Sequence, residues 1–120
     1  MRPSESLSVV RRYHHAWTTR NYGLAIAVLS PALEVEVPIN EYADAESFGQ
    51  ALRAFGDHVT RVELLSEMTS GEEVMLLYDM TVEGLGEFRV VEHFTVAAGK
   101  IVRLRQIHDT AGLRAAGFAG

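Results

Sequence analysis

The first third of the chain carries apolar residues at the spacing of helical faces. Between residues 4 and 20 they recur every three or four positions, at Leu7, Val10, Tyr13 or His14, and Trp17, which predicts an amphipathic helix. A second, short helix is expected over residues 22–29, ending before Pro31, because proline disfavours helix in the residue that precedes it. Asp44 then has the character of an N-cap, and a third helix is expected to run to about residue 56 with a buried stripe of Phe48, Leu52 and Phe55.

The remaining segments alternate apolar and polar residues, as half-buried strands do. A short strand is predicted at residues 33–37, ended by Pro38, and four longer ones follow at residues 59–69, 72–83, 87–97 and 101–109. Glycine-containing turns separate these four strands, so they are expected to form an antiparallel meander. Helices first and strands afterwards predict an α+β fold in which the helices cover one face of a curved sheet. A length of 120 residues predicts one domain spanning residues 1–120.

Even-numbered residues of the last three strands are predicted to face inward. They are Val74, Leu76, Tyr78, Met80 and Val82, then Phe88, Val90, Glu92, Phe94 and Val96, and finally Val102, Leu104, Gln106 and His108. Glu92 stands out, because an isolated carboxylate among apolar side chains must be hydrogen-bonded, paired or kept protonated by a raised pKa.

The loop between the last two strands decides which residue lies opposite Glu92. A three-residue loop at residues 98–100 would set Glu92 against Gln106 and, on the outer face, Arg89 against Asp109. A two-residue loop would set Glu92 against Arg105 and give an ordinary salt bridge. The inward parity of Gln106 favours the first register.

Composition narrows the possible partners. The chain is 48% hydrophobic and 22% charged, as expected of a soluble globular domain, and it has no cysteine, which excludes disulfides and thiolate chemistry. Its net charge of −5 and scattered basic residues argue against nucleic acid as a partner. Neither a signal peptide nor an apolar run of ~18 residues is present, so no membrane partner and a cytoplasmic location are expected. The histidine spacing favours no metal site, and no glycine-rich loop predicts a cofactor.

Two segments give the chain a family resemblance. Val9-Val10-Arg11-Arg12-Tyr13 on the first helix, with the last hairpin at residues 92–96 and 99–102, resembles the ketosteroid isomerase and SnoaL-like polyketide cyclase branch of the nuclear transport factor 2-like superfamily. The resemblance covers nearly the whole chain. It implies a cone-shaped domain, with three N-terminal helices packed on the concave face of a strongly curved, mostly antiparallel sheet around one small apolar pocket.

The resemblance also implies a set of functional residues. Tyr13 matches the tyrosine that donates a hydrogen bond to the dienolate oxygen in ketosteroid isomerases, and Glu92 falls where those enzymes keep a protonated aspartic acid. Val37, just before Pro38, stands where the family has its general-base aspartate. His14, beside Tyr13, is a candidate replacement base, since histidine titrates near neutrality. The expected pocket lining is completed by Trp17, Val37, Phe55, Tyr78, Met80, Phe94, Leu104, Gln106 and His108.

Three functions remain open from the sequence. The chain is an isomerase- or cyclase-like enzyme acting on a small apolar, carbonyl-bearing substrate; or it is a non-catalytic ligand-binding module that has lost its base; or it is a dimerisation domain whose cone is filled by its own side chains. In the last case Tyr13 is a buried aromatic residue and Glu92 a structural partner of Arg105 or Gln106. Apolar residues on the predicted outer sheet face, at Met75, Leu77, Val91 and Ile107, predict a homodimer formed through that face.

Overall fold

The computed structural model describes residues 3–38, 42 and 44–111. Its helices and strands follow in the order α1 (Pro3–Thr18), α2 (Tyr22–Ala27), β1 (Leu29–Glu36), α3 (Ala45–Gly56), β2 (Val59–Ser70), β3 (Glu73–Val82), β4 (Gly86–Ala97) and β5 (Lys100–Ile107). The strands form one sheet in the order β1-β5-β4-β3-β2, in which only the β1–β5 pair is parallel. The predicted α+β class and the antiparallel meander are therefore confirmed.

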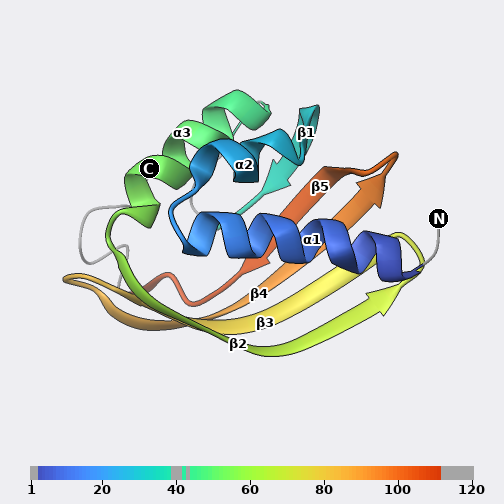
Figure 1. Ribbon diagram of the computed structural model, residues 1–120. Helices are drawn as coiled ribbons and strands as arrows, with labels where there is room; N and C mark the ends of the chain where they lie inside the picture. The colour runs from blue at the N-terminus through green and yellow to red at the C-terminus, as the bar shows by residue number, and fades with distance from the viewer. Residues whose placement is uncertain (1–2, 39–41, 43, 112–120) are drawn as a thin grey trace.

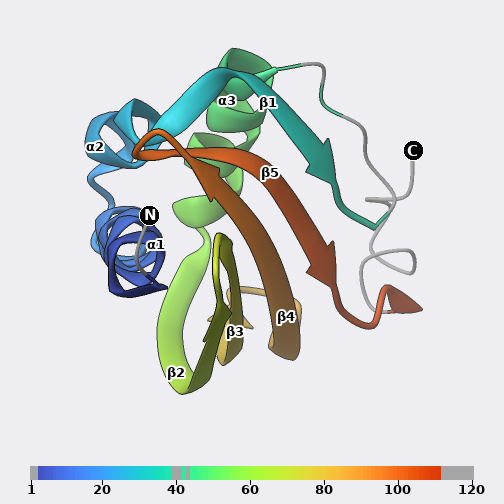
Figure 2. The ribbon, with the colours of Figure 1, turned by 90° about the vertical axis from the view of Figure 1, so that its right-hand side faces the viewer.

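All three helices lie on the concave face of the sheet. Figure 1 shows α1 crossing above the strands while α2 and α3 sit beyond it. The view turned by 90° shows how strongly the sheet bends, from β2 below α1 to β1 alongside α3 (Figure 2). This curvature gives the helices a concave surface to cover, as the predicted cone requires.

Side-chain hydrogen bonds fix the starts of α2 and α3. The Asn21 side chain accepts a hydrogen bond from the backbone N–H of Leu24 at the start of α2. Asp44 accepts from the backbone N–H of Ser47, and the Ser47 hydroxyl accepts in return from the backbone N–H of Asp44. This reciprocal arrangement satisfies backbone donors that a helix N-terminus leaves free, so the predicted N-cap at Asp44 is confirmed.

β1 starts earlier than expected, and the helix before it is shorter. The sequence predicted helix up to residue 29 and strand only from residue 33, whereas α2 ends at Ala27 and β1 begins at Leu29, with Pro31 inside it. Pro31 is tolerated because β1 is an edge strand, and its pairing with β5 is irregular between Leu29 and Glu34. The missing N–H of proline therefore falls where no ladder hydrogen bond is needed.

The β4–β5 hairpin has the predicted pairing of Glu92 but a shorter loop than predicted, followed by a β-bulge. Ala97 pairs with Lys100, so the loop is the two residues Ala98 and Gly99, both at positive φ (52° and 77°). A β-bulge at residues 101–103 then shifts the register by one residue, and Glu92 lies opposite Gln106 as predicted.

Two further expectations about this hairpin are wrong. The bulge reverses the alternation of inward-facing and outward-facing side chains at the start of β5. Ile101 is therefore fully buried, while Val102, which was predicted to face inward, is only half-buried. Arg89 binds Asp79 on β3 through two hydrogen bonds of 2.7 and 2.9 Å, and not Asp109, which lies beyond the end of β5.

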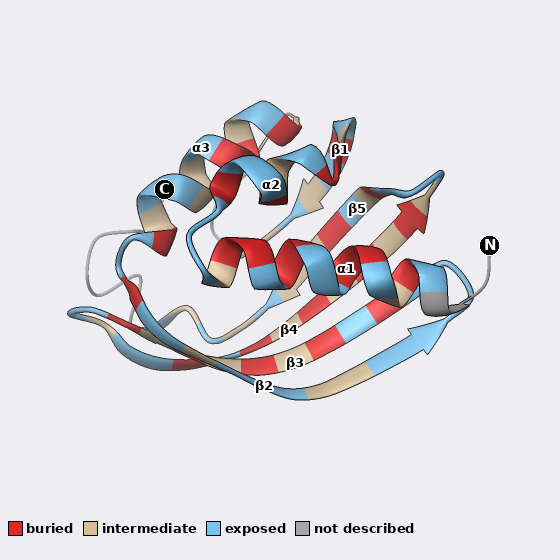
Figure 3. Cartoon of the chain, in the orientation of Figure 1, coloured by how far each residue is buried: buried red, intermediate tan, exposed pale blue. Residues whose placement is uncertain are grey.

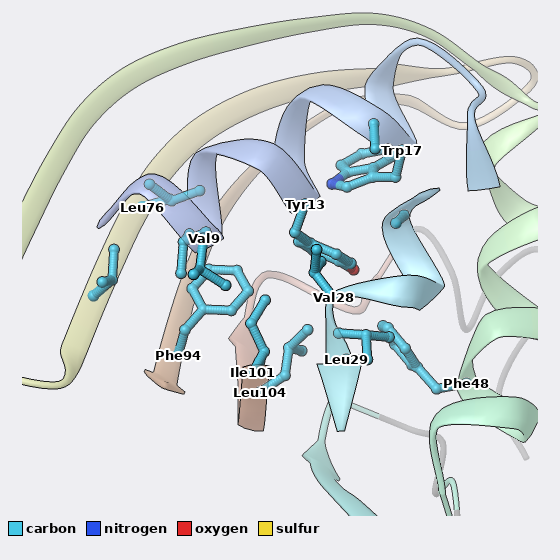
Figure 4. Packing of buried hydrophobic residues seen from close by; sticks show 14 of the residues in the cluster. Val9, Tyr13, Trp17, Val28, Leu29, Phe48, Leu76, Phe94, Ile101 and Leu104 are labelled. Atoms are coloured by element: carbon cyan, nitrogen blue, oxygen red, sulfur yellow. The ribbon is translucent and has the colours of Figure 1, made fainter. Parts of the chain in front are cut away.

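The core fills the space between the helices and the inner face of the sheet. Buried positions alternate along β3 and β4 on the predicted even parity, and a buried stripe runs along α1 (Figure 3). Phe94 and Leu104 are completely buried there, and the Tyr13 ring packs edge-on against Phe94 with centroids 5.8 Å apart (Figure 4).

Candidate functional site

The inner face does not close completely, and a cavity of about 130 Å³ remains between α3 and the sheet. Two α1 residues, four α3 residues, four strand residues and the segments after β1 and β5 line it: Tyr13, Trp17, Phe48, Ala51, Leu52, Phe55, Tyr78, Met80, Glu92, Gln106, Val37, Pro38, Tyr42 and His108. A cavity of ~150 Å³ in a protein interior holds a benzene molecule. The enclosed space here is therefore sized for a single ring.

The residues that line the cavity differ in exposure. Tyr13, Tyr78 and Glu92 are each only 1% exposed, so they form its closed end. The half-buried members of the same lining include Phe55, Tyr42, Gln106 and His108. The Tyr13, Tyr78 and Glu92 side chains are thus held away from solvent, where electrostatic interactions are strongest.

Only one of the two oxygens of the Glu92 carboxyl group has a hydrogen-bond partner. Its Oε2 accepts a hydrogen bond of 2.8 Å from Nε2 of Gln106, whereas Oε1 has no partner in hydrogen-bonding geometry. Burial raises the pKa of Glu92 to about 7, although Gln106 and the nearby Tyr78 hydroxyl act to lower it. The Tyr78 hydroxyl influences the pKa of the carboxyl, but Oε1 has no hydrogen bond of good geometry. A substantial fraction of Glu92 is therefore protonated at neutral pH.

Tyr13 and Tyr78 supply hydroxyl groups beside this carboxyl. Burial first, and then the charge of Glu92, raise the pKa of both tyrosines well above its ordinary value. Both hydroxyls consequently keep their protons at neutral pH and can donate hydrogen bonds. In Figure 4 the Tyr13 side chain projects from α1 into the space between the helix and the strands.

Most of the residues predicted for the site do line the cavity, but three do not. Phe94 and Leu104 lie in the core, and His14 is buried among other aromatic rings, 5.0 Å from Tyr78 and 5.7 Å from Trp17 between centroids. Burial lowers the pKa of His14 to about 4, so it is neutral at physiological pH. The structure thus separates His14 from the cavity.

Of the lining that helix α3 and the segment after β1 supply, the prediction named only Phe55 and Val37. Phe48, Ala51 and Leu52 from α3, with Pro38 and Tyr42, complete the wall. The signal for α3 was present, because Phe48, Leu52 and Phe55 form one helical stripe. That stripe faces the cavity as well as the core.

Comparison with known proteins identifies the family. A family model described as "SnoaL-like domain" matches residues 10–104. The chain belongs to the SnoaL-like domain family. No protein of curated function matches its sequence.

Solved structures agree with this SnoaL-like assignment. A protein from Kribbella flavida DSM 17836 is 25% identical with a TM-score of 0.86, over 92% of this chain and 91% of that chain. An NTF2-like protein from Burkholderia thailandensis E264 is 25% identical with a TM-score of 0.77, over 97% and 98%. A steroid delta-isomerase from Pseudomonas aeruginosa is 19% identical with a TM-score of 0.79, over 95% and 87%. The predicted superfamily is confirmed, whereas a shared fold leaves the activity open.

Within the residues that the structure describes, no helix is long and apolar enough to cross a membrane. No group of three histidine, aspartate or glutamate side chains within those residues is placed to hold a metal ion.

Proposed function

We propose that this SnoaL-like domain binds a single-ring apolar molecule that carries a carbonyl or phenolic oxygen, and that Tyr13 and the protonated Glu92 carboxyl hold this oxygen. The observation that carries the proposal is the state of Glu92. Its carboxyl group is 1% exposed and belongs to the cavity lining, yet one of its oxygens has no partner. A buried polar group without a partner is costly, and a ligand that supplies the partner recovers that cost.

The position of the proton on Glu92 follows from its neighbour. Gln106 donates to Oε2, so in the neutral acid the proton resides on Oε1 and is free to be donated. Together with the Tyr13 hydroxyl this gives two donors at the closed end of the cavity. Two donors in a desolvated site stabilise negative charge that develops on an oxygen atom, which is the requirement of an isomerase- or cyclase-like reaction of a carbonyl compound.

A second function is favoured by Val37. It lies in the cavity lining, at the position where the resembled enzymes have their general base, and valine cannot accept a proton. On this alternative the domain binds its ligand through the same donors without turning it over. Both functions require ligand binding, so binding is tested first.

Ultraviolet titration with 4-nitrophenol and other one-ring phenols at pH 6 tests the proposal, because these compounds present an enolate-like oxygen. Tyr13→Phe and Glu92→Leu should each weaken binding by about tenfold, as expected for the loss of one buried hydrogen bond. Tyr22→Phe and Glu87→Gln are matched controls outside the cavity lining and should bind normally. Failure of the unmodified protein to bind, or unchanged binding by both site variants, would refute the proposal.

A further inference from the structure

His108 is a half-buried residue of the cavity lining with one ring nitrogen already engaged. It follows β5 directly, and its ring stands edge-on to Phe88 with centroids 6.1 Å apart. Its Nδ1 is 3.0 Å from the backbone oxygen of Asp109. A carbonyl oxygen can only accept, so Nδ1 carries the hydrogen and Nε2 keeps its lone pair. The ring is therefore in the tautomer that accepts a proton at Nε2.

The imidazole lines the same cavity as the two donors. Gln106 and His108 are two residues apart on one side of the chain, and both line the cavity. Their Cα atoms are consequently about 7 Å apart. Gln106 binds Glu92, so the carboxyl and the imidazole belong to one continuous lining. A ring whose oxygen is held by Glu92 occupies the cavity that His108 also lines.

The other titratable groups of the described lining are unsuited to remove a proton from carbon. Burial raises the pKa of Tyr13, Tyr42 and Tyr78, so their hydroxyls stay protonated. Glu92 is committed to the ligand oxygen in the proposed function. His108 alone remains in this lining with a free lone pair on a side chain that commonly serves as a general base.

We infer that His108 is the general base of this site, and that it removes a proton from a carbon atom next to, or conjugated with, the carbonyl group of a single-ring ketone. This inference rests on the proposed binding of a carbonyl oxygen by Tyr13 and Glu92. The electron pair of the broken C–H bond forms a C=C bond, and the π pair of the carbonyl moves onto the oxygen, which receives hydrogen bonds from Glu92 Oε1 and Tyr13. The proton on Nε2 then returns to the same or the conjugated carbon, so no oxidant, reductant or second substrate is needed.

Hydrogen–deuterium exchange tests the base directly. Cyclohexanone is incubated with the protein in D₂O, and loss of the signal of the hydrogens next to the carbonyl is followed by proton NMR. Removal of a general base typically costs a factor of 10²–10⁴, so His108→Gln should slow the enzyme-dependent exchange by about a hundredfold. His15→Gln, an exposed histidine on α1, is the control and should exchange at the unmodified rate.

Two additional measurements separate a catalytic from a structural role. His108→Gln should bind 4-nitrophenol as the unmodified protein does, and added imidazole should restore exchange to His108→Ala, which leaves space where the ring was. Exchange by His108→Gln within threefold of the unmodified rate would overturn the inference. Phenol binding without any protein-dependent exchange would also overturn it while leaving the proposed binding function intact. Absence of phenol binding would remove both.

Discussion

At the scale of single residues, the chemistry of the site depends on which neighbour Glu92 has. Opposite Arg105 it would be an ion pair, and a nearby guanidinium would lower the pKa of its carboxyl. Opposite Gln106 it receives one neutral hydrogen bond, which does not offset burial, and its pKa rises to about 7. The amide N–H can donate to Oε2 in both forms of the acid, because Oε2 accepts whether or not Oε1 carries the proton. The pairing thus permits the proton to stay or leave.

The raised pKa of Glu92 predicts that ionisation destabilises the fold. The carboxyl ionises near pH 4.5 in the unfolded chain and near 7 in the folded one, so the free energy of unfolding falls as pH rises through this interval. Below pH 4.5 the group does not lower the free energy of unfolding, and above pH 7 it lowers it by about 3 kcal/mol. Glu92→Gln should remove this loss, as measured by urea unfolding at pH 5 and pH 8.

His14 acts in the opposite direction and must be separated from Glu92. Its pKa falls from 6.5 to about 4 on folding, so its contribution to stability is present above pH 6.5 and is lost as pH falls toward 4. The two effects partly cancel in the unmodified protein. The informative quantity is the difference in unfolding free energy between Glu92→Gln and the unmodified protein. An equal difference at pH 5 and pH 8 would contradict the raised pKa.

Sequence patterns were sufficient to find Glu92 and insufficient to place His14. A strand residue faces one of only two sides of the sheet, so a carboxylate that shares its side with apolar residues is easily recognised from the sequence. Neighbours on a helix differ by only about 100°, and both Tyr13 and His14 are buried, one beside Phe94 and the other beside Tyr78 and Trp17. Which of them reaches the cavity depends on how α1 is rotated over the sheet, and that is set by the partners of the helix.

At the scale of secondary-structure elements, strand irregularities were the part that the sequence did not disclose. The bulge in the β4–β5 hairpin and the shift in β2 between Leu64 and Ser66 each add one residue to a strand. Such an insertion depends on the opposing strand and leaves no local composition signal. The loop length of the hairpin was therefore wrong although the pairing of Glu92 with Gln106 was right.

Close packing of α2 on α3 predicts opposite effects for two glycine substitutions. A Cβ atom at Gly49 would lie 2.7 Å from Cδ1 of Ile26, whereas a Cβ at Gly23 would have no neighbour within 4 Å. Gly49→Ala should destabilise the fold by about 1 kcal/mol, because the overpacking exceeds the gain in helix propensity. Gly23→Ala should stabilise it by roughly 0.5–1 kcal/mol. Urea unfolding measures both.

The Gly49 substitution also has a consequence for the cavity. Ala51, Leu52 and Phe55 project from the same helix into the lining, so displacement of α3 by the added methyl group should alter phenol binding. Gly23→Ala should leave binding unchanged. Equal stabilisation by the two substitutions would show that α2 and α3 are not packed as closely as described.

At the scale of the whole molecule, the described helices cover only one face of the sheet (Figure 1). On the opposite face Leu77, Val91 and Ile107 form one row across β3, β4 and β5, and Met68 lies beside Met75 in the next. The sequence predicted four of these five residues. It omitted Met68 because no inward or outward face was assigned to the strand that carries it. Met68 and Ile107 are the most exposed large apolar residues described, at 68% and 70%.

This face has the properties of an interface between two copies of the chain. A specific dimer buries ~800 Å² on each partner, which requires the charged residues beside the apolar rows to be covered as well. Four of those residues are already paired, Asp79 with Arg89 at 2.7 Å and Glu73 with His93 at 2.8 Å. Arg105 lies opposite His93 on the same face and its buried Nε has no hydrogen-bond partner, so the second copy would have to match this charge.

A homodimer through the outer face is therefore expected, and light scattering coupled to gel filtration should give about twice the 13.3 kDa of one chain at high micromolar concentration. The double substitution Met75→Glu and Ile107→Glu places like charges on both copies of the apolar rows and should yield the monomer. Leu24→Glu replaces an equally exposed leucine on α2 and should leave the dimer intact. Because the cavity opens on the other side of the sheet, the monomeric variant should still bind phenols. A monomeric unmodified protein, or a dimer broken equally by Leu24→Glu, would rule out this face as the contact.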